Sequence, residues 1–256
     1  MPVGDGPAAA SRRPAGGAGR GGGLTPPGHP AELASRLVER LGGRYSLELG
    51  IDVDRGGEEV ERWALLATLF GNRIPAGIAT RTYRTLAQAG VRTIGEAGDQ
   101  SWEELVTLLD AGGYVRYDFR TATRLLDLAA TLRALGVGIV AVGAGLGRAE
   151  ELTAALDALP GWGPVTVRLF LRELRGIWPG AELPVDPHAL EAATHLGLVP
   201  ATSSPADALV ALRQLAEAAG LDLRDLETAL VRLALAHRRR LADCPGRAAC
   251  HALEPT

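Results

Sequence analysis

Apolar residues recur every three or four positions along most of the chain, and this spacing predicts a helical protein. In residues 58–70, for example, Val60 and Trp63 fall on one face of the predicted helix. No convincing strand alternation is present: residues 137–142 fit a short strand, but their flanking glycines favour a loop. The predicted helices span residues 31–41, 58–70, 74–89, 101–110, 118–135, 148–159, 164–175, 187–196, 204–219 and 223–239.

Composition supports the helical prediction and sets the size of the core. The chain has 256 residues, of which 46% are hydrophobic and only 4% aromatic, enough for one large domain or two small ones. Residues 1–29 consist mainly of Gly, Pro, Ala and Arg, which predicts a disordered arm. Arg12, Arg13 and Arg20 in this arm are available for nonspecific phosphate contacts, and an inert tail is the alternative.

Neither a membrane segment nor an export signal is expected. The N-terminus lacks the apolar region of a signal peptide, and the uncharged stretch 134–147 is too short to span a bilayer. The two cysteines suit a reducing cytoplasm.

A glycine-rich turn between two predicted helices is the first chemical signal. Residues 159–166 read Leu-Pro-Gly-Trp-Gly-Pro-Val-Thr. Gly161 and Gly163 permit a turn that β-carbons would obstruct, and Pro164 suits the first turn of the next helix. The backbone N–H groups at that helix start form a site for an anion.

An acidic residue at the start of a later helix is the second signal. Residues 185–188 read Val-Asp-Pro-His, which places Asp186 immediately before a helix. Together with the turn, this resembles the helix-hairpin-helix DNA glycosylase superfamily, of which endonuclease III is the best-known member. The resemblance implies that Asp186 stabilises an oxocarbenium-like sugar and activates water, by the logic of glycoside hydrolysis. A plain helix N-cap is the alternative role for Asp186.

The resemblance covers residues 58–250 and implies an all-α fold in two lobes. The barrel lobe is expected at residues 63–175. The second lobe is expected to combine residues 30–62 with residues 183–243, followed by a cysteine loop at residues 244–250.

The chain has no lysine: all 27 basic residues other than histidine are arginine. Members of the resembled family with lyase activity carry a lysine two residues after the second hairpin glycine, where this chain has Val165. The resemblance therefore implies base removal without strand cleavage. The N-terminal amine of Pro2, if Met1 is removed, is the one remaining amine route to a Schiff base.

The resemblance also implies which residues contact DNA. Residues 66–73 match the end of the first barrel helix, where Asn72 is the candidate to fill the gap left by a flipped base. Residues 112–118 match a turn that pushes a side chain into the base stack. Helix termination is the alternative role for Asn72, and an ordinary core or surface position is the alternative for Tyr114. The implied DNA-contacting residues are Gly161, Trp162, Gly163, Val165, Thr166, Asn72, Arg73, Tyr114, Val115 and Arg116.

Two C-terminal cysteines resemble the last two ligands of the family's [4Fe–4S] cluster. Cys244 and Cys250 have the matching spacing, but such a cluster needs four thiolates and the chain has two cysteines. We therefore expect that the cluster is lost and that no metal is bound here, with only a structural monovalent cation at the hairpin left as a possibility. A zinc site made of these cysteines with His237 and His251 is an alternative whose spacing is not a recognised one. The neighbouring run 238–240 is all arginine and suits a phosphate contact or a solvated helix end.

The main functional hypothesis is a monomeric, monofunctional DNA glycosylase of base excision repair, associated with the nucleoid. Its partner would be double-stranded DNA containing a damaged or mispaired base: uracil or thymine opposite guanine, or an alkylated or oxidised base. The net charge of −3 is unusual for a DNA-binding protein, although a local basic face matters more than the total. One alternative is a catalytically silent DNA-binding protein, and another is a glycosylase with lyase activity of the endonuclease III type.

Overall fold

The computed structural model describes residues 30–143, 145–237 and 243–253. These residues form α-helices and short 3-10 turns without any β-strand, which confirms the predicted all-α class. The arm 1–29 and the run 238–240 lie outside the described residues. The helices are α1 (Pro30–Leu41), α2 (Tyr45–Glu48), α3 (Gly57–Phe70), α4 (Ala76–Gln88), α5 (Ile94–Ala97), α6 (Trp102–Ala111), α7 (Asp118–Ala134), α8 (Ile139–Gly143), α9 (Ala149–Asp157), α10 (Pro164–Glu173), α11 (Pro187–His195), α12 (Pro205–Ala219) and α13 (Leu223–His237).

Local signals in the sequence set the start of several helices. At α6, the Ser101 hydroxyl accepts from the Glu104 N–H at 3.2 Å, and the Glu104 carboxylate accepts from the Ser101 N–H at 2.8 Å. This is the capping box that the Ser-x-x-Glu pattern of residues 101–104 predicts at the start of the helix expected at 101–110.

Residues 137–142, for which the flanking glycines favoured a loop, overlap the short helix α8. The Glu61 carboxylate accepts from the Val140 N–H at 3.2 Å, so a residue far away in sequence satisfies a backbone donor at this helix start. Gly143 lies so close to the Trp178 ring that a β-carbon would come within 2.2 Å of it. Tertiary packing therefore decides the conformation of this segment.

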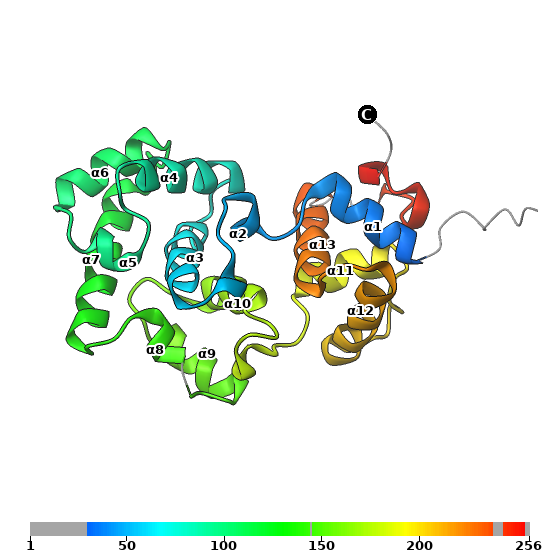
Figure 1. Ribbon diagram of the computed structural model, residues 1–256. Coiled ribbons are helices and arrows are strands. Elements are labelled where there is room, and N and C mark those ends of the chain that lie inside the picture. The colour runs from blue at the N-terminus through cyan, green and yellow to red at the C-terminus, as the bar shows by residue number, and fades with distance from the viewer. Residues whose placement is uncertain (1–29, 144, 238–242, 254–256) are drawn as a thin grey trace, which may run out of the picture.

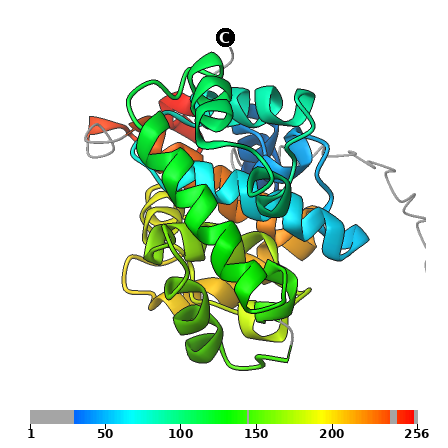
Figure 2. The ribbon, with the colours of Figure 1, turned by 90° about the vertical axis from the view of Figure 1, so that its left-hand side faces the viewer.

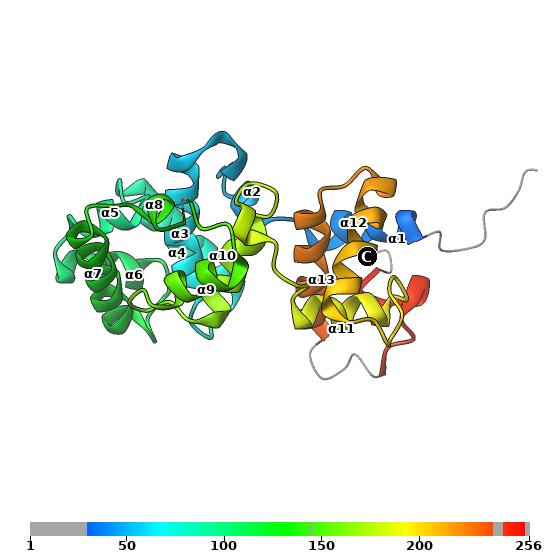
Figure 3. The same ribbon diagram turned by 90° about the horizontal axis from the view of Figure 1, so that it is seen from below.

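Two separate hydrophobic cores divide the chain into two lobes (Figure 1). The first lobe contains α2–α10. In the second lobe, α1 joins α11, α12, α13 and the C-terminal 3-10 turns. Viewed from below, the lobes are joined by the α1–α2 connection and by the segment that leads into α11 (Figure 3).

The N-terminal boundary between the lobes differs from the expected one. Residues 45–62 were expected in the second lobe, but Tyr45, Ile51 and Val60 belong to the first core. Tyr45 packs on Phe70 with ring centroids 4.7 Å apart, which draws α2 onto the end of α3. Of the helices within residues 30–62, only α1 belongs to the second lobe.

Helix α3 occupies the centre of the first lobe and positions the hairpin. It packs against α4, α8 and α10, while the long α7 runs along the outside against α5 and α6 (Figure 2). The Trp63 indole donates to the Phe170 carbonyl at 3.1 Å, which joins α3 to the hairpin's second helix. In the second lobe, α11 packs extensively against α13.

A buried ion pair joins the two lobes. Arg175, just after α10, contacts Glu227 of α13 at 3.0 Å, and the two side chains are only 2% and 1% exposed. Arg175 also donates to the Leu183 carbonyl in the connecting segment, at 2.6 Å. The pair therefore fixes α13 and the connection to α11 against the first lobe.

A more exposed ionic network reinforces the junction. Arg224 of α13 contacts Asp54 of the first lobe at 2.9 Å, and Arg44 contacts Asp225 at 3.2 Å. Hydrogen bonding to Arg224 lowers the pKa of the Asp54 carboxyl. The junction is thus held mainly by polar contacts rather than by a shared apolar core.

Within the described residues, no helix is both long and apolar enough to cross a membrane.

The first prediction concerns the buried pair. Replacing Glu227 with alanine leaves the Arg175 guanidinium buried without its partner, so we expect Glu227→Ala to lower the free energy of unfolding by about 3–5 kcal/mol. The control is Asp99→Ala, which removes the exposed ion pair with Arg133 and should cost about 1 kcal/mol or less. Thermal and urea unfolding measure both, and equal effects would contradict the structural role of the pair.

Candidate active site

The hairpin between α9 and α10 has the geometry that its glycines predicted. Gly161 has a φ of +78°, which favours glycine, and Gly163 is the extended N-cap of α10. Pro164 occupies the first turn of α10. The Trp162 N–H donates to the Leu159 carbonyl at 3.1 Å and closes the turn.

Two of the expected DNA-contacting side chains in this hairpin point into the protein. Trp162 is 6% exposed, donates from its indole to the Thr68 hydroxyl at 2.9 Å and packs edge-to-face on Phe170. Thr166 is buried where α10 approaches Gly71 closely. Both side chains hold the hairpin against α3, so only the backbone at these positions is available to a ligand.

Asp186 is fixed at the N-terminus of α11. Its Oδ1 accepts from the His188 N–H at 2.8 Å, as an N-cap does. Its own N–H donates to the Glu227 carboxylate at 3.1 Å, so the buried inter-lobe pair also positions the Asp186 backbone. The residue is 9% exposed.

A pocket of about 270 Å³ lies between the lobes and contains Asp186 in its wall. Val165, which is 69% exposed, lines the same pocket. The structure therefore brings together the candidate acid and the position where lyases of the resembled family carry lysine. The lining residues are Tyr45, Phe70, Ile74, Ala76, Val165, Arg168, Leu169, Arg172, Asp186, His188, Val231 and Leu235.

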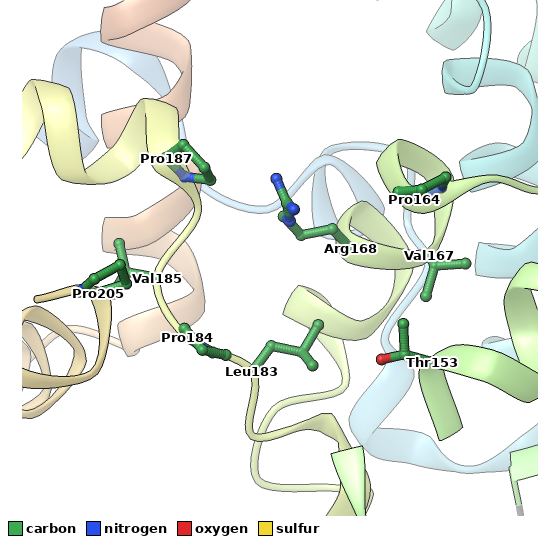
Figure 4. A pocket seen from close by; sticks show the side chains of 9 residues that line it. All are labelled: Thr153, Pro164, Val167, Arg168, Leu183, Pro184, Val185, Pro187 and Pro205. Atoms are coloured by element: carbon green, nitrogen blue, oxygen red, sulfur yellow. The ribbon is translucent and has the colours of Figure 1, made fainter. Parts of the chain in front are cut away.

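Arg168 stands between this pocket and a second one. Its guanidinium lies 3.8 Å from Asp186 Oδ2, an ionic contact longer than a hydrogen bond. It also lines a neighbouring pocket of about 310 Å³, where it projects from α10 toward Pro187 (Figure 4). The Arg168 side chain is 43% exposed, so it can turn toward a ligand without leaving a buried group unpaired.

Arg172 lines the same pocket as Asp186 and is almost fully buried. Its Nε and Nη2 atoms are buried without a hydrogen-bond partner among the described residues. Unsatisfied buried donors are costly, and because these two atoms are shielded from solvent, a ligand in the pocket would reach them only after a shift of the Arg172 side chain.

Arg168 and Arg172 are site residues that the sequence analysis missed. They follow Val165 by three and seven positions, which places all three on one face of α10. That spacing was the available signal, because the hairpin already fixed where α10 begins.

Asn72 is bound within the first lobe. Its Nδ2 donates to the Tyr114 hydroxyl at 3.0 Å and to the Thr121 hydroxyl at 3.3 Å. Helix α3 ends at Phe70 with Gly71 as its C-cap, and Asn72, directly after the cap, lacks the positive φ of a left-handed helix-terminating residue. Its contacts instead tie the α3–α4 connection to α7.

The expected wedge turn is partly buried. Tyr114 is 1% exposed, belongs to the first core and donates from its hydroxyl to the Leu69 carbonyl, so it is a core residue rather than a wedge. Burial raises its pKa to about 12. Val115 and Arg116 are exposed beside it, and Arg73 is exposed in the connection between α3 and α4. These three side chains therefore stay candidates for DNA contact.

The C-terminal loop brings the two cysteines close to histidines. Cys244, Cys250 and His237 gather with His195, the last residue of α11. His251, which the zinc alternative had named, is not in this group. Two cysteines do not fit the four-thiolate cluster of the resembled family.

Comparisons with known proteins place few constraints on function. The chain matches no protein-family model and no curated protein. It is similar to a solved structure described as "Structure of a Trapped Endonuclease III-DNA Covalent Intermediate: Estranged-Adenine Complex", with 15% identity and a TM-score of 0.42 over 87% of this chain and 94% of that one.

The acid next to Arg172 generates the second prediction. Glu173 is fully buried and accepts from the Tyr45 N–H at 3.1 Å. Burial raises its pKa from 4.5 to about 7, against the opposing effect of Arg172 and Arg44. The folded protein thus keeps this proton up to a higher pH than the unfolded chain does. The contribution of the protonated Glu173 side chain to the free energy of unfolding is therefore fully present below about pH 4.5, and it is lost as the pH rises to about 7.

We expect Glu173→Gln to remove this pH dependence, because glutamine resembles the protonated acid and does not titrate. The melting temperature of the parent should fall relative to that of the variant between about pH 4.5 and about 7. Parallel melting curves across this range would contradict the assigned protonation state.

Proposed function

We propose that this protein is a monofunctional DNA glycosylase of base excision repair that hydrolyses the N-glycosidic bond of a flipped base, with Asp186 as the catalytic carboxylate. The observation that carries the proposal is the pocket between the lobes, where Asp186 and the start of the hairpin helix face the same space. The motif resemblance at residues 159–166 and 185–188 supports the DNA substrate.

Bond cleavage in this pocket requires the stabilisation of positive charge. As the bond between sugar C1′ and the base nitrogen breaks, its electron pair leaves with the base and the sugar becomes oxocarbenium-like. The Asp186 carboxylate supplies a negative charge where water is largely excluded, which strengthens the attraction. Water then adds hydroxide to C1′, and its proton neutralises the departed base.

The pocket walls suit a flipped base. Tyr45 and Phe70 provide aromatic surface, and an extruded base is typically held by stacking and by hydrogen bonds to its edge. The unpartnered Arg172 donors can bond only to acceptors, since arginine has no acceptor atom. A flipped base that shifts Arg172 enough to reach these donors would need exposed acceptors, such as the carbonyl oxygens of uracil, thymine or an oxidised base.

Arg168 is assigned to the DNA backbone. Arginine pairs well with phosphate, and the exposed Arg168 side chain lies next to the start of the hairpin helix. Turning toward a phosphate would release the Asp186 carboxylate for the sugar. If Arg168 instead stays on Asp186, the charge of the carboxylate is neutralised, and this contact is what favours the alternative of a catalytically silent DNA-binding protein.

The third prediction tests Asp186. We expect Asp186→Asn to lose about 10²–10³-fold in single-turnover excision while still binding the duplex, because asparagine keeps the N-cap and removes only the charge. The parent and the variant are assayed on duplexes that each contain uracil, a G·T mispair, an alkylated purine or an oxidised pyrimidine, with hot alkali to reveal abasic sites.

The matched control is Asp207→Asn, which changes an acid in the first turn of α12, away from the pocket. This variant should excise at the parent's rate. If the parent binds these duplexes tightly but excises no base from any of them, the glycosylase proposal is contradicted and the catalytically silent DNA-binding protein is favoured.

The fourth prediction concerns the missing amine. Val165 lines the pocket with Asp186, so Val165→Lys places an amine where it can attack C1′. We expect the variant to cut the strand without alkali and to form an adduct with DNA that borohydride traps, whereas the parent does neither. Trapping of the parent chain itself would contradict the monofunctional assignment and support the lyase alternative.

A further inference from the structure

Four side chains with nitrogen or sulfur donors converge at the end of the second lobe farthest from Asp186 along α11. His195 is the last residue of α11, His237 is the last residue of α13, and Cys244 and Cys250 belong to the C-terminal segment. One potential ligand atom from each of the four lies within 4.8 Å of the others. They come from two parts of the chain: His195 from the end of α11, and the other three residues from positions 237–250.

Contacts between these side chains are close but leave donor capacity unused. Cys250 Sγ lies 3.4 Å from His237 Nε2, and the rings of His195 and His237 meet at 5.4 Å between centroids. The Nε2 of His195 is buried without a hydrogen-bond partner in the part of the chain that the structure describes. An apolar packing role does not account for a buried, unsatisfied ring nitrogen.

We propose that His195, His237, Cys244 and Cys250 bind one zinc ion in a tetrahedral structural site. Two thiolates and two imidazoles are a standard ligand set for structural zinc, and a closed site without an open position needs four ligands. The ligand atoms must move together by only a small amount to reach zinc–sulfur and zinc–nitrogen distances of about 2.3 Å and 2.0 Å.

The arrangement favours a single ion over an iron–sulfur cluster. A [2Fe–2S] cluster of the Rieske type also uses two cysteines and two histidines, but it holds the cysteines on one iron and the histidines on the other. Here Cys250 Sγ lies 3.4 Å from His237 Nε2, and all four donor atoms lie within 4.8 Å of one another. This leaves no room for two irons with separate ligand pairs.

The surrounding backbone supports the ligands as the outer shell of a metal site does. The His251 N–H donates to Cys244 Sγ at 3.4 Å, which stabilises a thiolate. Gly246 crosses directly over His195: a β-carbon there would lie 2.4 Å from the His195 carbonyl oxygen and 3.1 Å from its ring. With a φ of +69°, Gly246 lets the cysteine segment close against the end of α11.

The zinc would hold together the two helices that position the candidate active site. Helix α11 begins at the Asp186 N-cap, and α13 carries Glu227, which binds the Asp186 N–H. The ion would fasten the opposite ends of both helices. Its role would be structural, so the zinc proposal and the glycosylase proposal can fail independently.

The test is metal analysis of the full chain, purified under reducing conditions. By inductively coupled plasma mass spectrometry, we expect one zinc ion per chain and no stoichiometric iron. A chelator should lower the melting temperature, and added Zn²⁺ should restore it. His195→Ala should lose the zinc, while the matched control His251→Ala should keep it, because His251 is adjacent to Cys250 but outside the group.

A spectroscopic measurement on the parent covers the case in which His195→Ala does not fold. Co²⁺ in place of zinc should give the visible bands of a tetrahedral ion together with thiolate-to-cobalt charge transfer. Three results would overturn the proposal: a reduced chain that takes up no Zn²⁺ or Co²⁺, iron with the visible absorbance of a cluster, or loss of zinc from His251→Ala with retention in His195→Ala.

Discussion

The buried contact between Arg175 and Glu227 constrains the rest of the molecule. It joins the segment after the hairpin helix α10 to α13 of the other lobe, and the same carboxylate accepts the Asp186 N–H. A buried pair of charges is not a strong source of stability by itself, but losing one partner is costly. The contact therefore acts mainly on geometry: it allows one relative placement of the lobes near Asp186. The more exposed Arg224–Asp54 and Arg44–Asp225 contacts add to this placement.

The pocket follows from that placement. Its walls come from α3 and α10 on one side and from α11 and α13 on the other, so neither lobe forms it alone. Asp186 enters from the second lobe, and the first lobe contributes the arginines of α10. A carboxylate with a fixed backbone, next to one exposed and one buried arginine, suits the proposed binding of polyanionic DNA and stabilisation of a cationic sugar.

Local chemistry explains what the sequence could predict. The hairpin glycines, Pro164, the capping box at Ser101 and the Asp186 N-cap each depend on a few neighbouring residues. The predictions that were wrong concern residues whose placement depends on contacts with residues far away in the sequence. The lobe that receives Tyr45 and the inward direction of the Trp162 side chain are decided by contacts with Phe70 and Phe170, respectively, which the local sequence does not show. In the same way, the zinc alternative from the sequence named His251, whereas folding places His195, from the end of α11, in the C-terminal group.

The role proposed for the Asp186 carboxylate is to stabilise positive charge on the sugar. It is tested most directly by binding to duplexes in which the target nucleotide is replaced by a cationic pyrrolidine analogue or by the uncharged tetrahydrofuran. The parent should bind the pyrrolidine duplex more tightly, because a protonated ring nitrogen resembles the oxocarbenium-like sugar. Asp186→Asn should lose that preference while binding the tetrahydrofuran duplex as the parent does. Equal affinity of the parent for both duplexes would contradict the account.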